Sequence, residues 1–229
     1  MKDKLVIFDF ADTIAYLGPS KENLIQKFVL DESGFLLGDA SITNAYHYLN
    51  NSLFYSSVNI TNAADKEDFY KEFNRCLLGL LGVSHLVDFT LLYHFFKANK
   101  QHWHLKKETL EVLNALKARG HTISLVSNFD ASLDTLLEHL QVKKLFDSIF
   151  ISQCHGCEKP QPKFLSLPLE AHKASPSETY FIGDNYNLDF LPAHKLGMNA
   201  ILLDEGQRYK NIPLLSRINT LSDALTLLP

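Results

Sequence analysis

The sequence contains few of the residues that build covalent or membrane-anchored frameworks. It has only three cysteines in 229 residues, and an odd number cannot form a complete set of disulfides. No apolar run approaches the roughly 18 residues that a membrane helix needs. The first apolar run, Leu5–Phe8, is too short for the core of a signal peptide. We therefore expect a cytoplasmic protein without a disulfide framework.

The chain also lacks a large excess of charge of one sign. Its 22 lysines and arginines and 26 aspartates and glutamates give a net charge of −4, with a pI near 6.2. This balance gives no electrostatic reason to expect binding to nucleic acid or to an anionic membrane. Hydrophobic residues make up 46% of the chain and charged residues 21%, as in ordinary folded domains. The length of 229 residues suits one large domain, or one domain with an inserted module.

The second half of the chain alternates between short apolar runs and longer segments with apolar residues at helical spacing. The expected strands are 4–8, 121–127, 148–151, 179–182 and 199–203, and the expected helices are 107–119, 131–140, 162–172 and 188–196. Strands that alternate with helices in this way predict an α/β fold, in which helices cover a parallel sheet. Because the run 4–8 shows no polar alternation, we expect this strand to be buried on both faces.

The segment from about residue 16 to residue 103 has a different pattern. Its apolar residues recur at helical spacing, as at Leu24 and Phe28, without an alternation of strands and helices. We predict an all-helical module inserted after the first strand, which costs little when the two ends of an insertion lie close together. The alternative is an irregular helical extension of the same domain. Most aromatic residues of the segment are expected in its core and some could line a pocket; they include Phe54, Tyr55, Phe69, Tyr70 and Phe73.

Polar residues follow the ends of several predicted strands. The set consists of Asp9, Asp12 and Thr13 after the first strand, Ser127 and Asn128 after the second, Lys159 before the helix at 162–172, and Asp184 and Asp189 after the strand at 179–182. In an open parallel sheet, ligands bind outside the carboxyl ends of the strands. A single aspartate in such a place would most simply be a helix cap or a turn residue. The whole set in this order instead predicts a functional site at one edge of the sheet.

The motifs that carry these residues resemble those of the haloacid dehalogenase-like hydrolase superfamily. They are IFDFADTI at 7–14, LVSNFD at 125–130, GCEKPQP at 156–162 and FIGDNYNLDF at 181–190, with a weaker match in LGMNAILL at 196–203. The chain is identified as a member of the subgroup that has a helical cap inserted after the first core strand. The resemblance implies a Rossmann-like catalytic core at 1–15 and 104–229, and a cap at 16–103 that resembles the family only in position and helical character.

The residue types at this edge suit the transfer of a phosphoryl group to Asp9. A carboxylate can attack phosphorus and form an aspartyl-phosphate, which water later hydrolyses. Mg²⁺ prefers oxygen ligands and is usually held by one or two carboxylates together with substrate phosphate, which fits Asp9 and Asp184. The resemblance adds the backbone carbonyl of Ala11 as a metal ligand. The expected substrate is therefore a small phosphorylated metabolite, and the expected cofactor is Mg²⁺.

The remaining polar residues have supporting roles in this scheme. Lys159 would offset negative charge near the nucleophile and the transferring phosphoryl group. Ser127 would donate a hydrogen bond to a phosphoryl oxygen, with help from the backbone amides that follow it at Asn128. We expect Asp189 to orient Lys159 or a metal-bound water, and Thr13 to brace the loop after the first strand.

One position departs from the family pattern. Phosphatases of the family normally carry a second aspartate two residues after the nucleophile, where this chain has Ala11, and then a glycine, where it has Asp12. That aspartate protonates the leaving group and later activates water. General acid–base catalysis of this kind is typically worth roughly 10²–10⁴-fold in rate. The leaving-group chemistry is therefore open at Ala11.

Several interpretations of Ala11 remain. Asp12 or a cap residue could take over the proton transfer, since Asp tolerates a glycine-like left-handed backbone, although a shift by one residue would aim its carboxylate elsewhere. The leaving group could need no proton, as in an acyl phosphate. The protein could also bind a phosphorylated ligand or a partner with little turnover.

Two related reactions are less well matched. Phosphonoacetaldehyde hydrolases of the family also carry Ala here and use a cap lysine, but Lys21, Lys27, Lys66 and Lys71 leave no lysine at the required distance. The halide-removing members work without the metal and do not need Asp184, so its presence argues against dehalogenation.

The C-x-x-C pair at Cys154 and Cys157 is interpreted as ordinary loop residues. A structural zinc site needs four ligands, and the sequence has no second pair at the required spacing.

Overall fold

A computed structural model of the chain describes residues 4–50, 62–213 and 215–228. Contacts divide the chain into a core unit, Met1–Tyr16 with His104–Pro229, and an inserted unit, Leu17–Trp103. The division proposed from the sequence differs from this one only in the assignment of Tyr16. Over the described residues, none of the helices is both long and apolar enough to cross a membrane.

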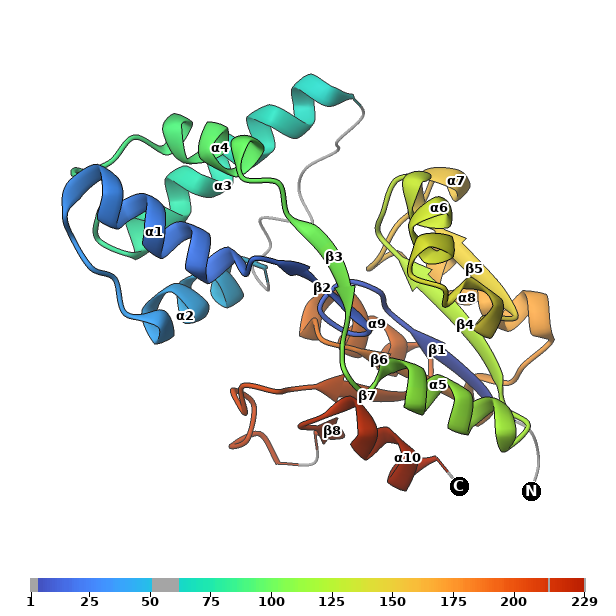
Figure 1. Cartoon of the computed structure of the whole chain (residues 1–229). Helices are drawn as coiled ribbons and strands as arrows, with labels where there is room; N and C mark the ends of the chain where they lie inside the picture. The colour runs from blue at the N-terminus through green and yellow to red at the C-terminus, as the bar shows by residue number, and fades with distance from the viewer. Residues whose placement is uncertain (1–3, 51–61, 214, 229) are drawn as a thin grey trace. The chain divides into compact units, whose positions relative to one another are not determined.

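The core unit is built on a six-stranded parallel sheet with the strand order β5-β4-β1-β6-β7-β8 (Figure 1). The bounds of the strands are Leu5–Phe8 (β1), Thr122–Ser127 (β4), Ser148–Ile151 (β5), Thr179–Gly183 (β6), Asn199–Leu203 (β7) and Arg217–Ile218 (β8). The predicted α/β class with a Rossmann-like parallel sheet is confirmed. The sequence pattern missed β8, since a strand of two residues is too short to show a periodicity.

Helices cover the sheet in the way that the alternation predicted. Their bounds are Thr109–Ala118 (α5), Ser132–His139 (α6), Ser152–His155 (α7), Pro162–His172 (α8), Leu191–Lys195 (α9) and Ala224–Leu227 (α10). In Figure 1, α5 lies against β4 and next to α10. Helix α8 contacts α9, β1 and β5, and α9 contacts β7. All four residues of β1 are buried, as expected for the central strand of a sheet that is covered on both faces.

The predicted helix at 188–196 differs from the structure near its start. The chain first makes a single wide turn with π-helical geometry at Tyr186–Phe190, and α9 begins only at Leu191. The side-chain oxygen of Asn185 accepts hydrogen bonds from the backbone N–H groups of Asn187 and Leu188, which caps this turn. Turns of this kind are rare and often occur at functional sites.

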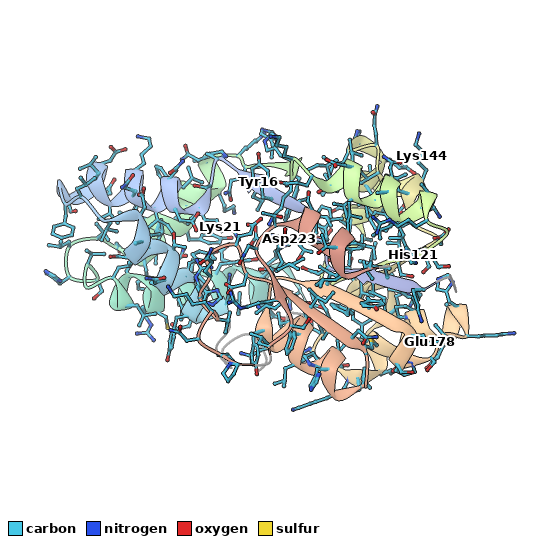
Figure 2. The ribbon with its side chains drawn as sticks, turned by 90° about the horizontal axis from the view of Figure 1, so that it is seen from below. Tyr16, Lys21, His121, Lys144, Glu178 and Asp223 are labelled. Atoms are coloured by element: carbon cyan, nitrogen blue, oxygen red, sulfur yellow. The ribbon has the colours of Figure 1, made fainter. Side chains whose placement is uncertain are left out.

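The two edges of the sheet carry different residues. At the edge where strands begin, the imidazole of His121 accepts a hydrogen bond from the backbone N–H of Lys4, and the Lys4 ammonium lies 3.5 Å from the carboxylate of Glu178. His121 and Glu178, which immediately precede β4 and β6, are labelled in Figure 2. The residues proposed for the functional site all follow the opposite ends of the strands, so they share the carboxyl edge.

The described part of the inserted unit is mainly helical, with α1 (Lys21–Ser33), α2 (Asp39–Asn50), α3 (Ala63–Leu80) and α4 (Phe89–Ala98). Helices α1, α3 and α4 start at side-chain caps, such as Asp88, whose carboxylate accepts a hydrogen bond from the Thr90 backbone. A separate two-stranded sheet, β2 (Ala15–Gly18) and β3 (His102–Leu105), lies where the chain leaves and re-enters the core unit. The all-helical prediction missed this sheet.

Buried apolar side chains from all four helices form one cluster inside the inserted unit. Phe73 is buried in this cluster, and Phe69 is also buried, whereas Tyr70 is 37% exposed. The expectation that most of these aromatics are core residues therefore holds for Phe69 and Phe73. Phe54 and Tyr55 lie outside the described residues.

Candidate active site

The centre of the candidate site is a buried lysine between two aspartates. Lys159 Nζ lies 2.6 Å from Asp9 Oδ1 and 2.6 Å from Asp189 Oδ1. Burial alone would lower the pKa of Lys159, but the charges of Asp189 and Asp9 outweigh it and raise this pKa. The lysine therefore stays protonated and holds a fixed positive charge against the Asp9 carboxylate. Because the three residues lie far apart in sequence, only the folded sheet brings them together.

Thr13 joins the two carboxylates that were proposed as metal ligands. Its hydroxyl oxygen lies 3.3 Å from Asp9 Oδ2 and 3.2 Å from Asp184 Oδ1, so its single proton can serve either carboxylate. The same oxygen accepts a hydrogen bond from the backbone N–H of Asp184 at 3.1 Å. Thr13 is fully buried, and it ties the end of β1 to the end of β6.

Asp189 is held by the wide turn after β6. One of its oxygens accepts the hydrogen bond from Lys159, and the other accepts the backbone N–H of Asn185 at 3.0 Å. Gly183 makes room for it, because a Cβ on Gly183 would come within 2.4 Å of the carboxyl carbon of Asp189. The glycine, the capped turn and the buried aspartate therefore form one unit that fixes the Lys159 ammonium.

Ser127 is the last residue of β4, the neighbour of β1, and Asn128 follows it. The side-chain amide of Asn128 donates to the backbone carbonyl of Lys159 at 2.9 Å and accepts the Lys159 backbone N–H at 2.8 Å. The side chain of Asn128 therefore positions Lys159, which leaves only its backbone for the predicted phosphate contact. Ser127 is 1% exposed. Its hydroxyl makes no hydrogen bond to any residue in the described ranges, so it remains available as a donor.

The carboxylates of the site repel one another. The pKa of Asp9 is raised to about 6. Burial is the main cause, the charge of Asp189 raises the pKa further, and the charge of Lys159 lowers it only in part. Burial also raises the pKa of Asp184 well above its ordinary value, and the charges of Asp12, Asp9 and Asp189 raise it further. The site thus holds more negative charge than its protein cations offset, as expected where a metal cation binds.

The arrangement fits a magnesium ion. Carboxylate oxygens of Asp9, Asp184 and Asp189 lie within 4.8 Å of one another. Within the described residues, these three form a group that could hold a metal ion. Ligands on opposite sides of Mg²⁺ lie about 4.2 Å apart, since each Mg–O distance is about 2.1 Å. Asp9 Oδ2 and Asp184 Oδ1 share the single Thr13 proton, so at least one of them stays open to a cation, whereas both oxygens of Asp189 accept hydrogen bonds of their own.

The loop after β1 leaves the carbonyl of Ala11 available. The backbone N–H of Asp12 donates to Ala15, and that of Ala15 donates to Phe10. In the described part of the chain, no backbone N–H donates to the Ala11 carbonyl itself. This is compatible with its proposed use as a third protein ligand of the metal.

The backbone at Asp12 is not that of a strand residue. The chain has already left β1 at this residue and adopts a left-handed backbone with φ of 57°. The glycine-like conformation expected for Asp12 is thus present. The charge of Asp12 raises the pKa of Asp184, so Asp12 stays a candidate for the proton transfer.

The other candidate residues lie apart from this cluster or carry ordinary contacts. Cys157 is buried and Cys154 is exposed, and both are free thiols. Among the lysines of the inserted unit, Lys27 pairs with Asp31 and Lys71 pairs with Glu67. The sequence pattern missed one charged residue of the core unit, Lys106, whose charge lowers the pKa of Asp184. It follows β3, a strand that the sequence pattern missed, and it belongs to none of the motifs, so no spacing could have singled it out.

A model of the haloacid dehalogenase-like hydrolase family matches residues 4–197, which include every proposed site residue. Among curated proteins, haloacid dehalogenase-like hydrolase domain-containing protein 3 of Bos taurus is 30% identical over 101 residues, which cover 44% of this chain and 40% of that protein. Ribulose-1,5-bisphosphate 5-phosphatase of Halopiger xanaduensis is 25% identical over 114 residues, or 49% of this chain and 48% of that protein.

Phosphoglycolate phosphatase of Aliivibrio fischeri is 26% identical over 117 residues, or 51% of this chain and 51% of that protein. The matched regions thus span about half the length, or less, of these curated relatives.

Two solved structures share the fold over nearly the whole chain. The HAD-hydrolase YfnB from Bacillus subtilis, bound to magnesium, has a TM-score of 0.68 at 19% identity and covers 100% of this chain and 99% of its own. A dehalogenase has a TM-score of 0.66 at 19% identity and covers 99% of this chain and 97% of its own. At such identities the likeness concerns the fold alone.

Proposed function

The chain belongs to the haloacid dehalogenase-like hydrolase family, and we propose that it is a Mg²⁺-dependent phosphohydrolase that acts on a small phosphorylated metabolite through an aspartyl-phosphate. The observation that carries this proposal is the buried ion triad in which Lys159 Nζ lies 2.6 Å from Asp9 and 2.6 Å from Asp189, next to Asp184. A fixed cation beside a carboxylate nucleophile offsets the repulsion between that carboxylate and a phosphate dianion.

Each residue has a part in the reaction. Asp9 attacks phosphorus with one carboxylate oxygen, the bond from phosphorus to the leaving oxygen breaks, and an aspartyl-phosphate remains. Lys159 and the hydroxyl of Ser127 stabilise negative charge on the phosphoryl oxygens. Mg²⁺ held by Asp9, Asp184 and the Ala11 carbonyl would supply further positive charge to the same oxygens. Water then hydrolyses the aspartyl-phosphate and restores Asp9.

Ala11 limits the substrates that such a site can process well. Its methyl side chain cannot protonate a leaving oxygen, so esters of poor leaving groups need another proton source. Asp12 is one candidate, because its charge acts on the neighbouring Asp184. Substrates with a good leaving group, such as acyl phosphates, need no acid and fit the residues of the site directly.

Phosphatases among the relatives agree with this assignment. Two of the curated proteins that match are named as phosphatases of phosphoglycolate and of ribulose-1,5-bisphosphate. Dehalogenases are among the structural neighbours. Dehalogenation is less well supported. Asp184 lies with Asp9 and Asp189 in the group of potential metal ligands, and the halide-removing members of the family do not need a carboxylate at the position of Asp184.

Ala11 also favours a second candidate function, in which the protein binds a phosphorylated ligand with little turnover. Binding would use Lys159, Ser127 and the metal in the same way. The two candidates differ in whether Asp9 becomes phosphorylated.

The deciding experiment measures phosphate release from a panel of phosphate esters and acyl phosphates, with Mg²⁺ and with EDTA. We expect Mg²⁺-dependent release that is lost in Asp9→Asn and kept in Asp68→Asn, a matched change of an exposed aspartate on α3. If no substrate gives metal-dependent release and Asp9→Asn behaves like the parent protein, the hydrolase proposal is wrong. Retained binding of phosphate with Mg²⁺ would then favour the second candidate.

A further inference from the structure

Lys106 is a charged residue of the core unit that the proposed chemistry does not use. It follows β3, and its backbone N–H donates to the carbonyl of Ile14 at 3.0 Å. The hydroxyl of Thr109, at the start of α5, donates to the same carbonyl at 2.6 Å. Ile14 follows directly after Thr13, which contacts both Asp9 and Asp184. The backbone of Lys106 is therefore anchored to the loop that carries the nucleophile.

The side chain of Lys106 extends from this loop to the loop after β7. Its Nζ lies 2.8 Å from a carboxylate oxygen of Glu205, which is two residues past the end of β7. In the sheet, β6 lies between β1 and β7, and β6 ends next to Asp184. A side chain that joins the loops after β1 and β7 therefore crosses the end of β6, on the Asp184 side of the site.

Burial and charge agree with this position. The side chain of Lys106 is only 11% exposed, whereas its partner Glu205 is 55% exposed. The positive charge of Lys106 lowers the pKa of Asp184, against burial and the charges of three other carboxylates. Lys159 is already enclosed by Asp9 and Asp189. Lys106 is thus a second cation of the site. Its charge acts on Asp184, whereas Lys159 lies between Asp9 and Asp189.

Lys106 retains capacity for a ligand. An ammonium group has three N–H donors, and in the described ranges its only ion-pair partner is Glu205. Glu205 is the exposed partner of the pair, so water can replace its carboxylate and its exchange for another anion costs little. A lysine binds carboxylate and phosphate oxygens alike, as a compact point charge.

We propose that Lys106 binds a second anionic oxygen group of the substrate, and so makes the site selective for phosphorylated compounds whose leaving part is itself anionic. The geometry behind this proposal is the span of Lys106 from the Asp9–Thr13 loop to Glu205 across the end of β6. Glu205 forms an ion pair with Lys106 when no substrate is present, and its carboxylate competes with the substrate anion for the ammonium group. The proposal rests on the proposed phosphohydrolase function, since it concerns substrate selection at the same site.

The test compares two chromogenic esters that differ only in one carboxylate, 4-nitrophenyl phosphate and 3-carboxy-4-nitrophenyl phosphate. The measured quantity is the ratio of their kcat/KM values with Mg²⁺. We expect the parent protein to prefer the carboxylated ester. Lys106→Met should reduce this preference by about 10- to 100-fold, through KM of the carboxylated ester, because hydrogen bonds to charged groups are worth about 1.5–3 kcal/mol.

Two further variants make the comparison specific. Lys107→Met removes the exposed neighbouring lysine and should leave the ratio unchanged. Glu205→Gln removes the competing carboxylate and should increase the preference by about 2- to 5-fold. Because Glu205 is exposed, this variant tests the proposal even if Lys106→Met does not fold.

The outcomes separate this inference from the function on which it rests. A ratio that stays constant in Lys106→Met and Glu205→Gln, while Mg²⁺-dependent turnover continues, would overturn the role of Lys106 and leave the hydrolase proposal intact. If neither ester is turned over, the wider panel of esters and acyl phosphates decides the hydrolase proposal. Calorimetric binding of the two esters to Asp9→Asn, with and without Lys106→Met, then decides whether Lys106 recognises the carboxylate.

Discussion

The carboxyl group of Asp189 fills the space that a side chain on Gly183 would need at the end of β6. A Cβ on Gly183 would lie 2.4 Å from the Asp189 carboxyl carbon. Backbone strain does not explain the need for glycine at this position. The close approach lets a buried carboxylate turn back from the wide turn at Tyr186–Phe190 and reach Lys159. Gly183 therefore matters to the site through the side chain that it admits.

We predict that Gly183→Ala displaces Asp189 and leaves Lys159 with one partner. Phosphate release should fall by at least about 100-fold, since small displacements of catalytic groups carry costs of this order. The free energy of unfolding should fall by about 1–3 kcal/mol, the usual cost of overpacking. Steady-state kinetics and urea unfolding measure the two effects.

The matched control is Gly79→Ala, because Gly79 lies in α3 with no atom within 4 Å of its added Cβ. This change should leave activity intact and raise stability by about 0.5–1 kcal/mol. If Gly183→Ala keeps full activity, Asp189 is not needed to hold Lys159.

The sequence predicted five of the six strands of the core sheet and the edge of the sheet that carries the site, because both depend on local patterns. β5, β7 and α8 have the bounds that the apolar runs indicated. The fixed order of polar residues after strands is sufficient to place Asp9 and Asp184 together, since parallel strands end at one edge.

What the sequence could not predict depends on contacts between distant residues. The side chain of Asn128 is engaged by the Lys159 backbone, and no pattern reveals whether an amide faces a ligand or the protein. The position of Lys106 depends on its contacts with Ile14 and Glu205. The left-handed backbone of Asp12 lies after the end of β1, where the alternation of strand residues no longer applies.

We predict that Asp184→Asn stabilises the metal-free protein. The folded state raises the pKa of this carboxyl, so its ionised form destabilises the fold at any pH above its ordinary pKa. Removal of the charge should raise the free energy of unfolding by about 1 kcal/mol at pH 8 in EDTA, and the gain should shrink as the pH falls and the carboxyl becomes protonated.

The same variant should lose Mg²⁺ binding, so Mg²⁺ should stabilise the parent protein and not Asp184→Asn. Urea unfolding at several pH values, with and without Mg²⁺, measures both effects. Asp68→Asn, which changes an exposed carboxylate, should show neither. Equal stability of Asp184→Asn and the parent in EDTA would contradict the repulsion among the carboxylates of the site.

We predict that Mg²⁺ binding weakens in acid. Burial and Asp189 raise the pKa of Asp9 to about 6 in the metal-free protein, so below this pH a proton competes with the metal for the carboxylate. The Kd for Mg²⁺ should rise by at least roughly tenfold per pH unit below pH 6, because Asp9 takes up one proton there and Asp184, whose pKa is also raised, competes for a second. Isothermal titration in buffers of different ionisation enthalpy measures both Kd and proton release. A Kd that stays constant from pH 8 to pH 5 would show that Asp9 is not a ligand.

We predict that Ala11→Asp increases the turnover of unactivated phosphate esters. The half-buried side chain of Ala11 stands where the family's phosphatases carry their acid, and a carboxylic acid there can protonate the leaving oxygen. General acid catalysis of this kind is worth roughly 10²–10⁴-fold, so an alkyl phosphate should gain at least about 100-fold in kcat. Acetyl phosphate should gain little, because its leaving group needs no proton.

Ala11→Asn is the control, since it adds a side chain of nearly the same size that cannot donate a carboxyl proton. A gain in Ala11→Asp that Ala11→Asn does not share shows that the wild-type site lacks an acid. Unchanged or lower rates in both variants would instead mean that another residue already transfers the proton. In that case Asp12→Asn should abolish the turnover of alkyl phosphates, since Asp12 is the neighbouring carboxylate whose charge acts on Asp184.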